Sequence, residues 1–261
     1  MMRKKIDIFW LAAFLLAAIT LLSGCDDAST SFDDDDEDRA WYLTGLMVKD
    51  YNLHAFRARA DLTRDDSDLT TATIVLRNDT LEEEAGIYAL EVSPAGAYQA
   101  GSYNLSITDS TLLSATVSTQ LPDSFAIDIV DPANRINNGG AQVSVDWFGS
   151  DGADGYVLAA VPAYQAYTGP GYSAWANTAA TAGTIPTSAF RWRDGVNLDT
   201  GWYYIYVYSF ADVPDSSLAH TVTPTPIPQQ LADNIETDSL TGHFGAVLVA
   251  MRDSVHVVFQ P

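Results

Sequence analysis

The sequence predicts an all-β protein, with two tandem β-sandwiches after an N-terminal segment of another kind. From residue 41 onward the chain consists of short runs rich in β-branched and aromatic residues, separated by clusters of Asp, Gly, Asn and Pro. In several runs the apolar residues occupy every second position, as in Gln142–Trp147. The chain shows no convincing amphipathic helical pattern, and turn signals at intervals of roughly 8–12 residues favour sandwiches over α/β units.

Composition limits the classes of function. The chain has 261 residues, of which 47% are apolar, so it can build a substantial core. Its net charge of −21 argues against nucleic acid as a partner, because gripping phosphates requires clustered Lys and Arg. Its single cysteine excludes an internal disulfide framework and a cysteine-based zinc site.

The first 24 residues have the pattern of a signal peptide. Arg3, Lys4 and Lys5 form a basic start, and the uncharged apolar run Ile8–Leu22 follows. A membrane-spanning helix needs about 20 apolar residues, and this run is shorter. An ordinary secretory signal or an uncleaved anchor would show much of the same pattern.

The end of this segment, Leu22-Ser23-Gly24-Cys25, resembles the lipobox of bacterial lipoproteins at every position. The resemblance implies cleavage between Gly24 and Cys25, a diacylglycerol on the Cys25 sulfur, and fatty acylation such as palmitate on the new amino group. Each buried CH₂ contributes about 0.8 kcal/mol, so two or three acyl chains would hold the protein at a membrane. We expect no other cofactor.

The composition of residues 25–40, which begin with the lipidated Cys25 of this interpretation, predicts a disordered acidic tether. Residues 33–38 are six consecutive acids, whose mutual repulsion keeps a chain extended. The run could instead gather calcium weakly or act as a sorting signal. It resembles surface-export signals of Bacteroidetes lipoproteins, whereas Asp26 resembles the inner-membrane retention signal of enteric bacteria. We expect the cell envelope, with the outer membrane or cell surface favoured over the periplasmic face of the inner membrane.

We assign residues 41–121 to the first sandwich, with a boundary near Leu121-Pro122-Asp123. Gly101-Ser102-Tyr103-Asn104-Leu105-Ser106-Ile107 resembles the Gly-x-Tyr-x-Leu-x-Ile strand of immunoglobulin-like modules in surface lipoproteins. The predicted strands are Trp41–Lys49, Leu53–Leu62, Ala72–Arg77, Gly86–Val92, Ser102–Thr108 and Leu112–Gln120.

We assign residues 122–261 to the second sandwich, which resembles a fibronectin type III domain. Val143–Trp147 resembles strand B with its core Trp, and Gly155–Leu158 resembles strand C. Leu198–Tyr204 resembles the Leu-x-Pro-x-Thr-x-Tyr entry to strand F, although Thr200 and Trp202 replace the usual Pro and Thr. This resemblance places Tyr204 at the tyrosine corner. A long insertion, Ala211–Gly242, precedes the end of the domain. The predicted strands are Phe125–Val130, Gln142–Trp147, Tyr156–Val161, Thr184–Trp192, Trp202–Phe210, Phe244–Ala250 and Val255–Phe259.

Two segments are candidate sites. The loop 162–175 carries four rings among Gly and Pro, which is the composition of recognition loops, although the rings could equally cover a sheet edge or an interdomain seam. They are Tyr164, Tyr167, Tyr172 and Trp175. Asp151 and Asp154, in an Asp-Gly-rich stretch, could hold calcium or simply form a turn.

The residues of catalysis are missing from the sequence. There is no Gly-x-Ser-x-Gly elbow or His-Glu-x-x-His motif, and the four histidines have no close ligand spacing. We therefore expect a membrane-anchored envelope lipoprotein with a non-catalytic binding, adhesion or accessory-subunit role and a protein or glycan partner. The alternative is a glycan-directed hydrolase, or a carbohydrate-binding accessory, that uses the loop 162–175.

Overall fold

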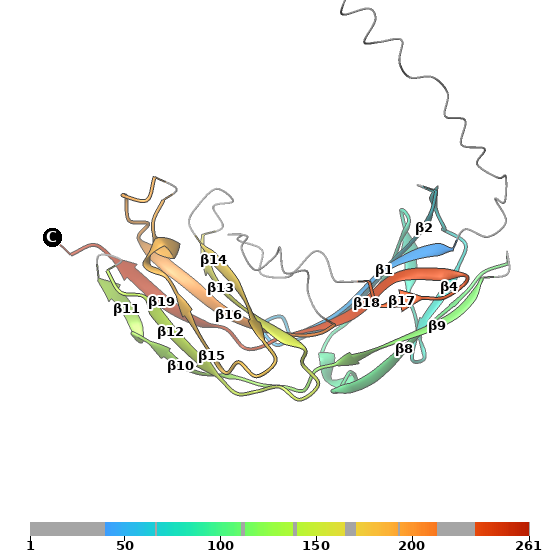
Figure 1. Ribbon diagram of the computed structural model, residues 1–261, viewed down its shortest axis with the longest axis horizontal. Helices are drawn as coiled ribbons and strands as arrows, with labels where there is room; N and C mark the ends of the chain where they lie inside the picture. Colours follow the sequence, from blue (N-terminus) through green and yellow to red (C-terminus); the bar gives the residue numbers. More distant parts are fainter. Residues whose placement is uncertain are drawn as a thin grey trace, which may run out of the picture. The chain divides into compact units, whose positions relative to one another are not determined.

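The computed structural model describes residues 40–65, 67–110, 113–137, 140–164, 171–192, 194–212 and 233–260. The predicted signal peptide, Cys25 and the predicted acidic tether up to residue 39 therefore lie outside the described residues. The predicted all-β class and its sandwich sheets are confirmed (Figure 1). Within these ranges no helix is long and apolar enough to cross a bilayer.

The described strands form three sheets. The four-stranded sheet has the order β5-β4-β8-β9 and contains Asp79–Thr80, Thr73–Leu76, Gly101–Thr108 and Ser114–Leu121. The three-stranded sheet has the order β10-β12-β15 and contains Ile127–Asp131, Val143–Trp147 and Ala182–Ile185. Two short 3₁₀ helices, Ala95–Ala97 and Thr187–Phe190, connect strands.

The third sheet has twelve strands and belongs to both sandwiches. Its first-sandwich members are β1 (Trp41–Asp50), β2 (Ala55–Arg64), β3 (Ser67–Asp68), β6 (Glu82–Glu84), β7 (Ile87–Val92), β17 (Ile235–Glu236) and β18 (Leu240–Val249). Its second-sandwich members are β11 (Asn134–Asn137), β13 (Gly155–Pro162), β14 (Tyr172–Asn177), β16 (Gly201–Ala211) and β19 (Asp253–Val258).

Alternation of side chains builds a separate core in each sandwich. On β1, Leu43 and Met47 point inward and join the first core, which also contains Leu105 of the four-stranded sheet. In the second core, Trp147 and Tyr156 are buried with rings 5.6 Å apart. Trp147 thus lies in the core, as the resemblance to strand B implies.

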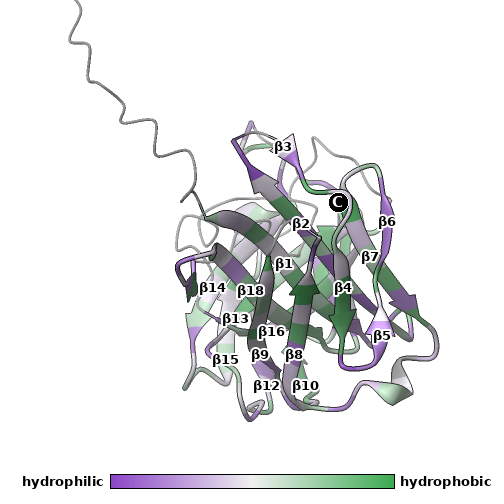
Figure 2. Cartoon of the chain, turned by 90° about the vertical axis from the view of Figure 1, so that its right-hand side faces the viewer, coloured by the Kyte–Doolittle hydropathy of each residue, from purple (hydrophilic) through white to green (hydrophobic). Residues whose placement is uncertain are grey.

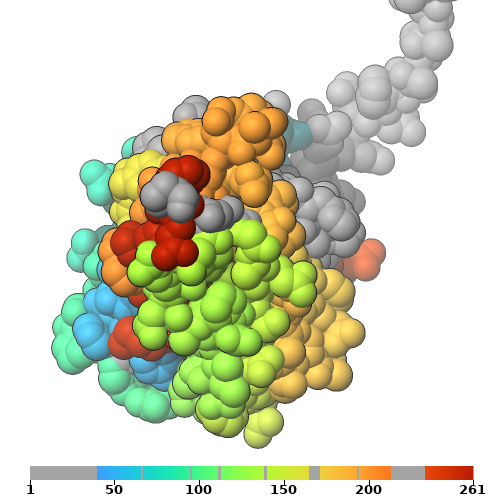
Figure 3. All heavy atoms as spheres, turned by 90° about the vertical axis from the view of Figure 1, so that its left-hand side faces the viewer, coloured from blue at the N-terminus to red at the C-terminus, as the bar shows by residue number. Residues whose placement is uncertain are grey.

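The consecutive strands β18 and β19 connect the two sandwiches. β18 pairs in parallel with the whole of β1, and its last four residues also pair with β16. β19 continues along β16 and pairs in parallel with β11. Figure 1 shows β18 and β19 in red, one after the other, with β1 in blue beside β18. Figure 3 shows the strands around β11 in yellow-green next to the red C-terminal strand.

The sequence division at residue 121 does not anticipate this exchange. β18 lies in the second segment of the chain, yet it supplies a strand to the first sandwich and covers the edge of β1 that would otherwise be unpaired. Most of the predicted insertion Ala211–Gly242 lies outside the described residues, but β17 and the start of β18 form its end.

Hydrophilic strands lie at two other sheet edges. β5 and β6 are exposed along their whole length, and β6 is a run of three glutamates. Figure 2 shows β6 in the hydrophilic colour and β4 in the hydrophobic one. Short and charged edge strands discourage pairing with other chains, so strand addition is disfavoured at these two edges.

Candidate binding face

The face of the twelve-stranded sheet that points away from both cores carries a row of aromatic side chains. On β16, Tyr203, Ile205 and Val207 point into the second core. The alternate residues therefore point to the opposite face, which we call the outer face. The aromatic stripe on this face consists of Trp202, Tyr204, Tyr206 and Tyr208.

Neighbouring rings support one another along the stripe. Trp202 stacks on His256 of β19, with ring centroids 4.7 Å apart and an interplanar angle of 9°. Tyr206 stacks on Tyr208 at 5.7 Å and meets Tyr204 edge-on at 6.4 Å. Exposure falls from 48% at Trp202 to 1% at Tyr208. The solvent-accessible end of the stripe is therefore rigid, which lowers the entropy cost of binding.

Arg252 adds a fixed positive charge to the stripe. Its guanidinium carbon lies 3.7 Å from the centre of the Tyr204 ring, and its Nη1 donates a hydrogen bond of 2.9 Å to the Tyr206 hydroxyl. That hydrogen bond raises the pKa of Arg252 above its already high ordinary value. Its backbone N–H donates to Asn52 Oδ1 at 2.9 Å, which connects it to the β1–β2 turn.

A buried apolar cluster continues the outer face from β16 toward β1. Its members come from three adjacent strands, and Leu46 and Val48 of β1 pack against it. Burial raises the pKa of Tyr208 well above its ordinary value, and its hydroxyl has no hydrogen-bond partner in the described part of the chain. The cluster consists of Val157, Ala159, Tyr208, Phe210, Val247 and Val249.

The structure does not bring together the aromatic residues predicted from the loop 162–175. Part of that loop is strand β14, on which Tyr172 packs against the second core and Trp175 points to the outer face. Trp175 is 36% exposed. Tyr164 precedes β14 and binds Asp199 instead, and Tyr167 lies outside the described residues. Among the described residues of the loop, Tyr164, Tyr172 and Trp175 therefore do not face one common site, and the role of the loop in binding stays a prediction.

Asp199 anchors two of the tyrosines. Its carboxylate is buried and its Oδ2 accepts hydrogen bonds from the hydroxyls of Tyr203, at 2.6 Å, and Tyr164. Burial, followed by the contact with Asp199, raises the pKa of both tyrosines, so both hydroxyls stay protonated donors. This arrangement holds the entry to strand β16 in place.

The inward tyrosine of this region is Tyr203, whereas the family resemblance places Tyr204 at the tyrosine corner. Tyr203 binds a side chain four residues upstream, and Tyr204 points outward beside Arg252. In the first sandwich, the Tyr103 hydroxyl donates to the Gln99 carbonyl at 2.6 Å, which is the expected bond to an upstream backbone group.

Asp151 and Asp154 lie in the connection between β12 and β13. Asp154 Oδ2 accepts the backbone N–H of Asp212 at 2.6 Å, and the Asp151 carbonyl accepts the N–H of Asp123 at 2.8 Å. Among the described residues there is no group of three or more His, Cys, Asp or Glu side chains suited to a metal. Calcium binding here stays a prediction, and the observed contacts are those of a turn.

Sequence reasoning missed Arg252 and His256 as members of the outer face. The stripe itself was visible as the aromatic run of β16, but its partners come from β19, about fifty residues further along the chain. Only the pairing of Trp202 with His256 and the position of Arg252 just before β19 bring them to it.

No protein-family model matches the chain, and no curated protein matches it. Solved structures do resemble it. The FN1–FN3 domains of chicken CNTN1 share 10% identity at a TM-score of 0.32, covering 82% of this chain and 65% of that one. A Ca²⁺-stabilized adhesin that helps an Antarctic bacterium reach out and bind ice shares 12% identity at a TM-score of 0.23, covering 85% of this chain and 50% of that one.

A third similar structure is SGBP-B of a Bacteroides ovatus mixed-linkage glucan utilization locus, in complex with a heptasaccharide. It shares 13% identity at a TM-score of 0.20, covering 78% of this chain and 41% of that one. This chain therefore spans two thirds or less of each of these structures. At such identities and TM-scores these likenesses assign neither a family nor a function to this chain.

Proposed function

We propose that this protein is a lipoprotein of the bacterial cell envelope that binds a protein or glycan partner without catalysing a reaction. The lipobox Leu22–Cys25 supports the anchor, and the acidic run after it supports an extended spacer. In this proposal the acyl chains on Cys25 hold the protein at a membrane, with the outer membrane or cell surface favoured.

The observation that carries the binding role is the aromatic stripe with Arg252. The backbone of a strand advances about 6.4–6.8 Å over two residues, so Trp202, Tyr204 and Tyr206 form a row about 13 Å long. The row offers apolar edges, hydroxyl groups and a guanidinium. These groups hold a ligand in place and none of them is an activated nucleophile.

A glycan is the second candidate for the partner class, and the exposure of Trp202 favours it. Trp202 is 48% exposed and stacks on His256, and Tyr204 with Arg252 follows further along the same stripe, so the stripe offers an aromatic surface together with hydrogen-bond donors. This is the combination of an apolar face and a few placed polar groups that ligand sites use.

The anchor is tested by fractionating cells that produce the full-length chain. We expect Cys25→Ser to release the protein from the membrane fraction. Ser23→Ala keeps the lipobox pattern, so this variant should stay in the membrane fraction. Lipidation of Cys25 is refuted if mass spectrometry finds no acyl group on Cys25 of the wild type, or if Cys25→Ser stays in the membrane fraction as Ser23→Ala does. Protease treatment of intact cells then separates the cell surface from the periplasm.

The binding role is tested with the full-length protein on peptidoglycan sacculi, a soluble polysaccharide panel and intact cells. We expect Trp202→Ala to weaken retention at least tenfold, because interface aromatics contribute about 2 kcal/mol or more. Trp192→Ala, which removes an exposed ring outside the stripe, serves as the matched control. Equal retention of both variants on every surface would exclude the stripe as the contact.

A further inference from the structure

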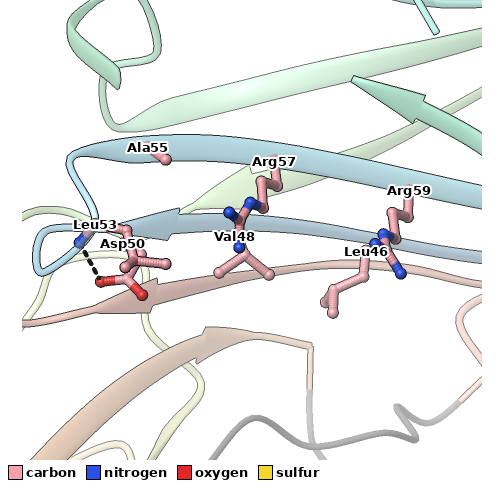
Figure 4. A pocket seen from close by; sticks show the side chains of 7 residues that line it. All are labelled: Leu46, Val48, Asp50, Leu53, Ala55, Arg57 and Arg59. Carbon is pink, nitrogen blue, oxygen red and sulfur yellow. Dashed lines mark hydrogen bonds between the residues drawn. The ribbon is translucent and has the colours of Figure 1, made fainter. Parts of the chain in front are cut away.

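A second feature of the outer face lies at the β1–β2 hairpin, apart from the aromatic stripe. It is an open cavity of about 260 Å³ (Figure 4). Four aliphatic side chains, Leu46, Val48, Leu53 and Ala55, line much of it. Leu53 is 54% exposed, so the cavity opens to solvent.

Two arginines from β2 complete the lining. Arg57 is the cross-strand neighbour of Val48, and Arg59 is the neighbour of Leu46, so each guanidinium lies beside an aliphatic side chain. Figure 4 shows both arginines on the same side of the sheet as Leu46 and Val48. A ligand in the cavity would meet an apolar surface and positive charge together.

The two arginines differ in how far they are already paired. Arg57 faces Glu91 of β7 and forms a bidentate ion pair with it, with Nε–Oε2 at 3.1 Å and Nη2–Oε1 at 3.3 Å. This fixes the side chain and leaves the Nη1 donors unused among the described residues.

Arg59 is the unpaired cation of the cavity. Its neighbours across the two strand pairs are Leu46 and Ala89, and its guanidinium has no hydrogen bond or ion pair in the part of the chain that the structure describes. The remaining polar group, Asp50, accepts hydrogen bonds from Asn52 and Leu53 within its own turn.

We propose that this cavity binds the carboxylate of a ligand with a short aliphatic body. The body would lie on Leu46, Val48 and Leu53, and the carboxylate would accept hydrogen bonds from Arg59 and the Nη1 group of Arg57. No aromatic ring lines the cavity, so stacking on a sugar does not contribute. Asp50 and Glu91 nearby disfavour groups that carry more than one negative charge.

The volume of the cavity limits the size of the ligand. Pockets for drug-sized molecules have volumes of about 300–1,000 Å³, so this cavity accepts a smaller group. Two sources provide it. One is a free short-chain fatty acid, and the other is the C-terminal carboxylate of a partner protein whose last residue is apolar.

The test measures binding of hexanoate to the full-length protein by saturation-transfer NMR. We expect hexanoate to bind and hexanol, which has the same chain without the charge, to bind at least tenfold more weakly. Arg59→Gln should weaken the binding of hexanoate at least tenfold and leave the binding of hexanol unchanged. Leu53→Ala should weaken the binding of both ligands. Arg64→Gln is the control, because Arg64 lies on the same strand but covers Trp41 at 4.6 Å, outside the cavity.

The peptide Ala-Ala-Leu with a free carboxylate, compared with its amide, separates the two sources. Binding of the free peptide at least tenfold tighter than hexanoate indicates a protein C-terminus, and the reverse order indicates a free acid. The proposal is overturned if hexanoate and hexanol bind with equal affinity, or if neither hexanoate nor the free peptide binds. It is also overturned if Arg59→Gln, shown to be folded by circular dichroism, binds hexanoate as tightly as the wild type does.

Discussion

Replacing Gly242 by alanine should weaken the junction between the two sandwiches more than any conservative change at a surface glycine. Gly242 lies in the parallel ladder of β18 with β1, opposite Leu43 as the third pair of the ladder, and its φ is +115°. A Cβ at this position would lie 2.1 Å from the Leu43 carbonyl oxygen and 2.9 Å from its nitrogen. Both atoms are backbone, so they can move only if the two strands separate.

The expected cost has two parts. A non-glycine residue in a sparsely populated backbone region costs about 1–3 kcal/mol. The forced contact adds about 1–3 kcal/mol, in the range of overpacked cores. The sum, about 2–6 kcal/mol, is a large share of the 5–15 kcal/mol that stabilises an ordinary domain.

The measurement is urea unfolding followed by circular dichroism, combined with hydrogen exchange. We expect a lower midpoint for Gly242→Ala and faster exchange along β1 and β18. Gly149→Ala is the matched control, because a Cβ there would meet no atom within 4 Å. A Gly242→Ala protein that unfolds at the wild-type midpoint, with normal exchange at Leu43, would refute the parallel pairing.

Three further predictions concern buried or paired polar groups. Tyr203→Phe should lower the free energy of unfolding by about 1.5–3 kcal/mol, because it removes the hydroxyl that donates a hydrogen bond to the buried Asp199. Tyr204→Phe should lower it by less, and equal urea midpoints for the two variants would contradict this prediction. Lys49→Met should cost about 1–3 kcal/mol by leaving the Tyr98 carbonyl without its 2.7 Å donor, and a thermal melt identical to the wild type would exclude that bond. The hydrogen bond to Asp233, burial and the charge of Asp233 raise the pKa of Tyr42 from 10.0 to about 12, so this pair stabilises the fold fully below about pH 10 and loses its contribution as the pH rises through 12. The measurement is the phenolate absorbance of the wild type minus that of Tyr42→Phe, followed as the pH rises. We expect this difference to show a step near pH 12, and Asp233→Asn should move the step toward pH 10. A wild-type step at pH 10 would disprove the contact.

The strands were the most predictable part of the fold. The predicted runs Trp41–Lys49, Gly86–Val92 and Trp202–Phe210 coincide closely with β1, β7 and β16, because alternating apolar residues report directly which side chains enter a core. The parallel pairing of β18 with β1 was beyond prediction, since the two strands are about 190 residues apart and local pattern carries no information on partners.

The candidate site was less predictable than the fold, for a reason visible at two positions. Tyr203 and Tyr204 are adjacent and chemically identical, so only the register of β16 decides which is buried and which faces solvent. The loop 162–175 was recognised by composition, but composition does not reveal that Tyr172 and Trp175 lie on opposite faces of β14. Arg59 was not singled out because its lack of an acidic neighbour depends on which residues stand across β1 and β7.

The parallel pairing of β1 with β18 also determines how the protein would respond to mechanical force. Because β18 and β19 both run antiparallel to β16, they run in the same direction as β1. Tension between the N-terminal start of β1 and the C-terminal end of β19 would slide β1 along β18 and load their interstrand hydrogen bonds together rather than one at a time. A chain moored at one end and pulled at the other by its partner would thus meet a shear-loaded junction, whose lifetime is governed by the rate of forced unfolding.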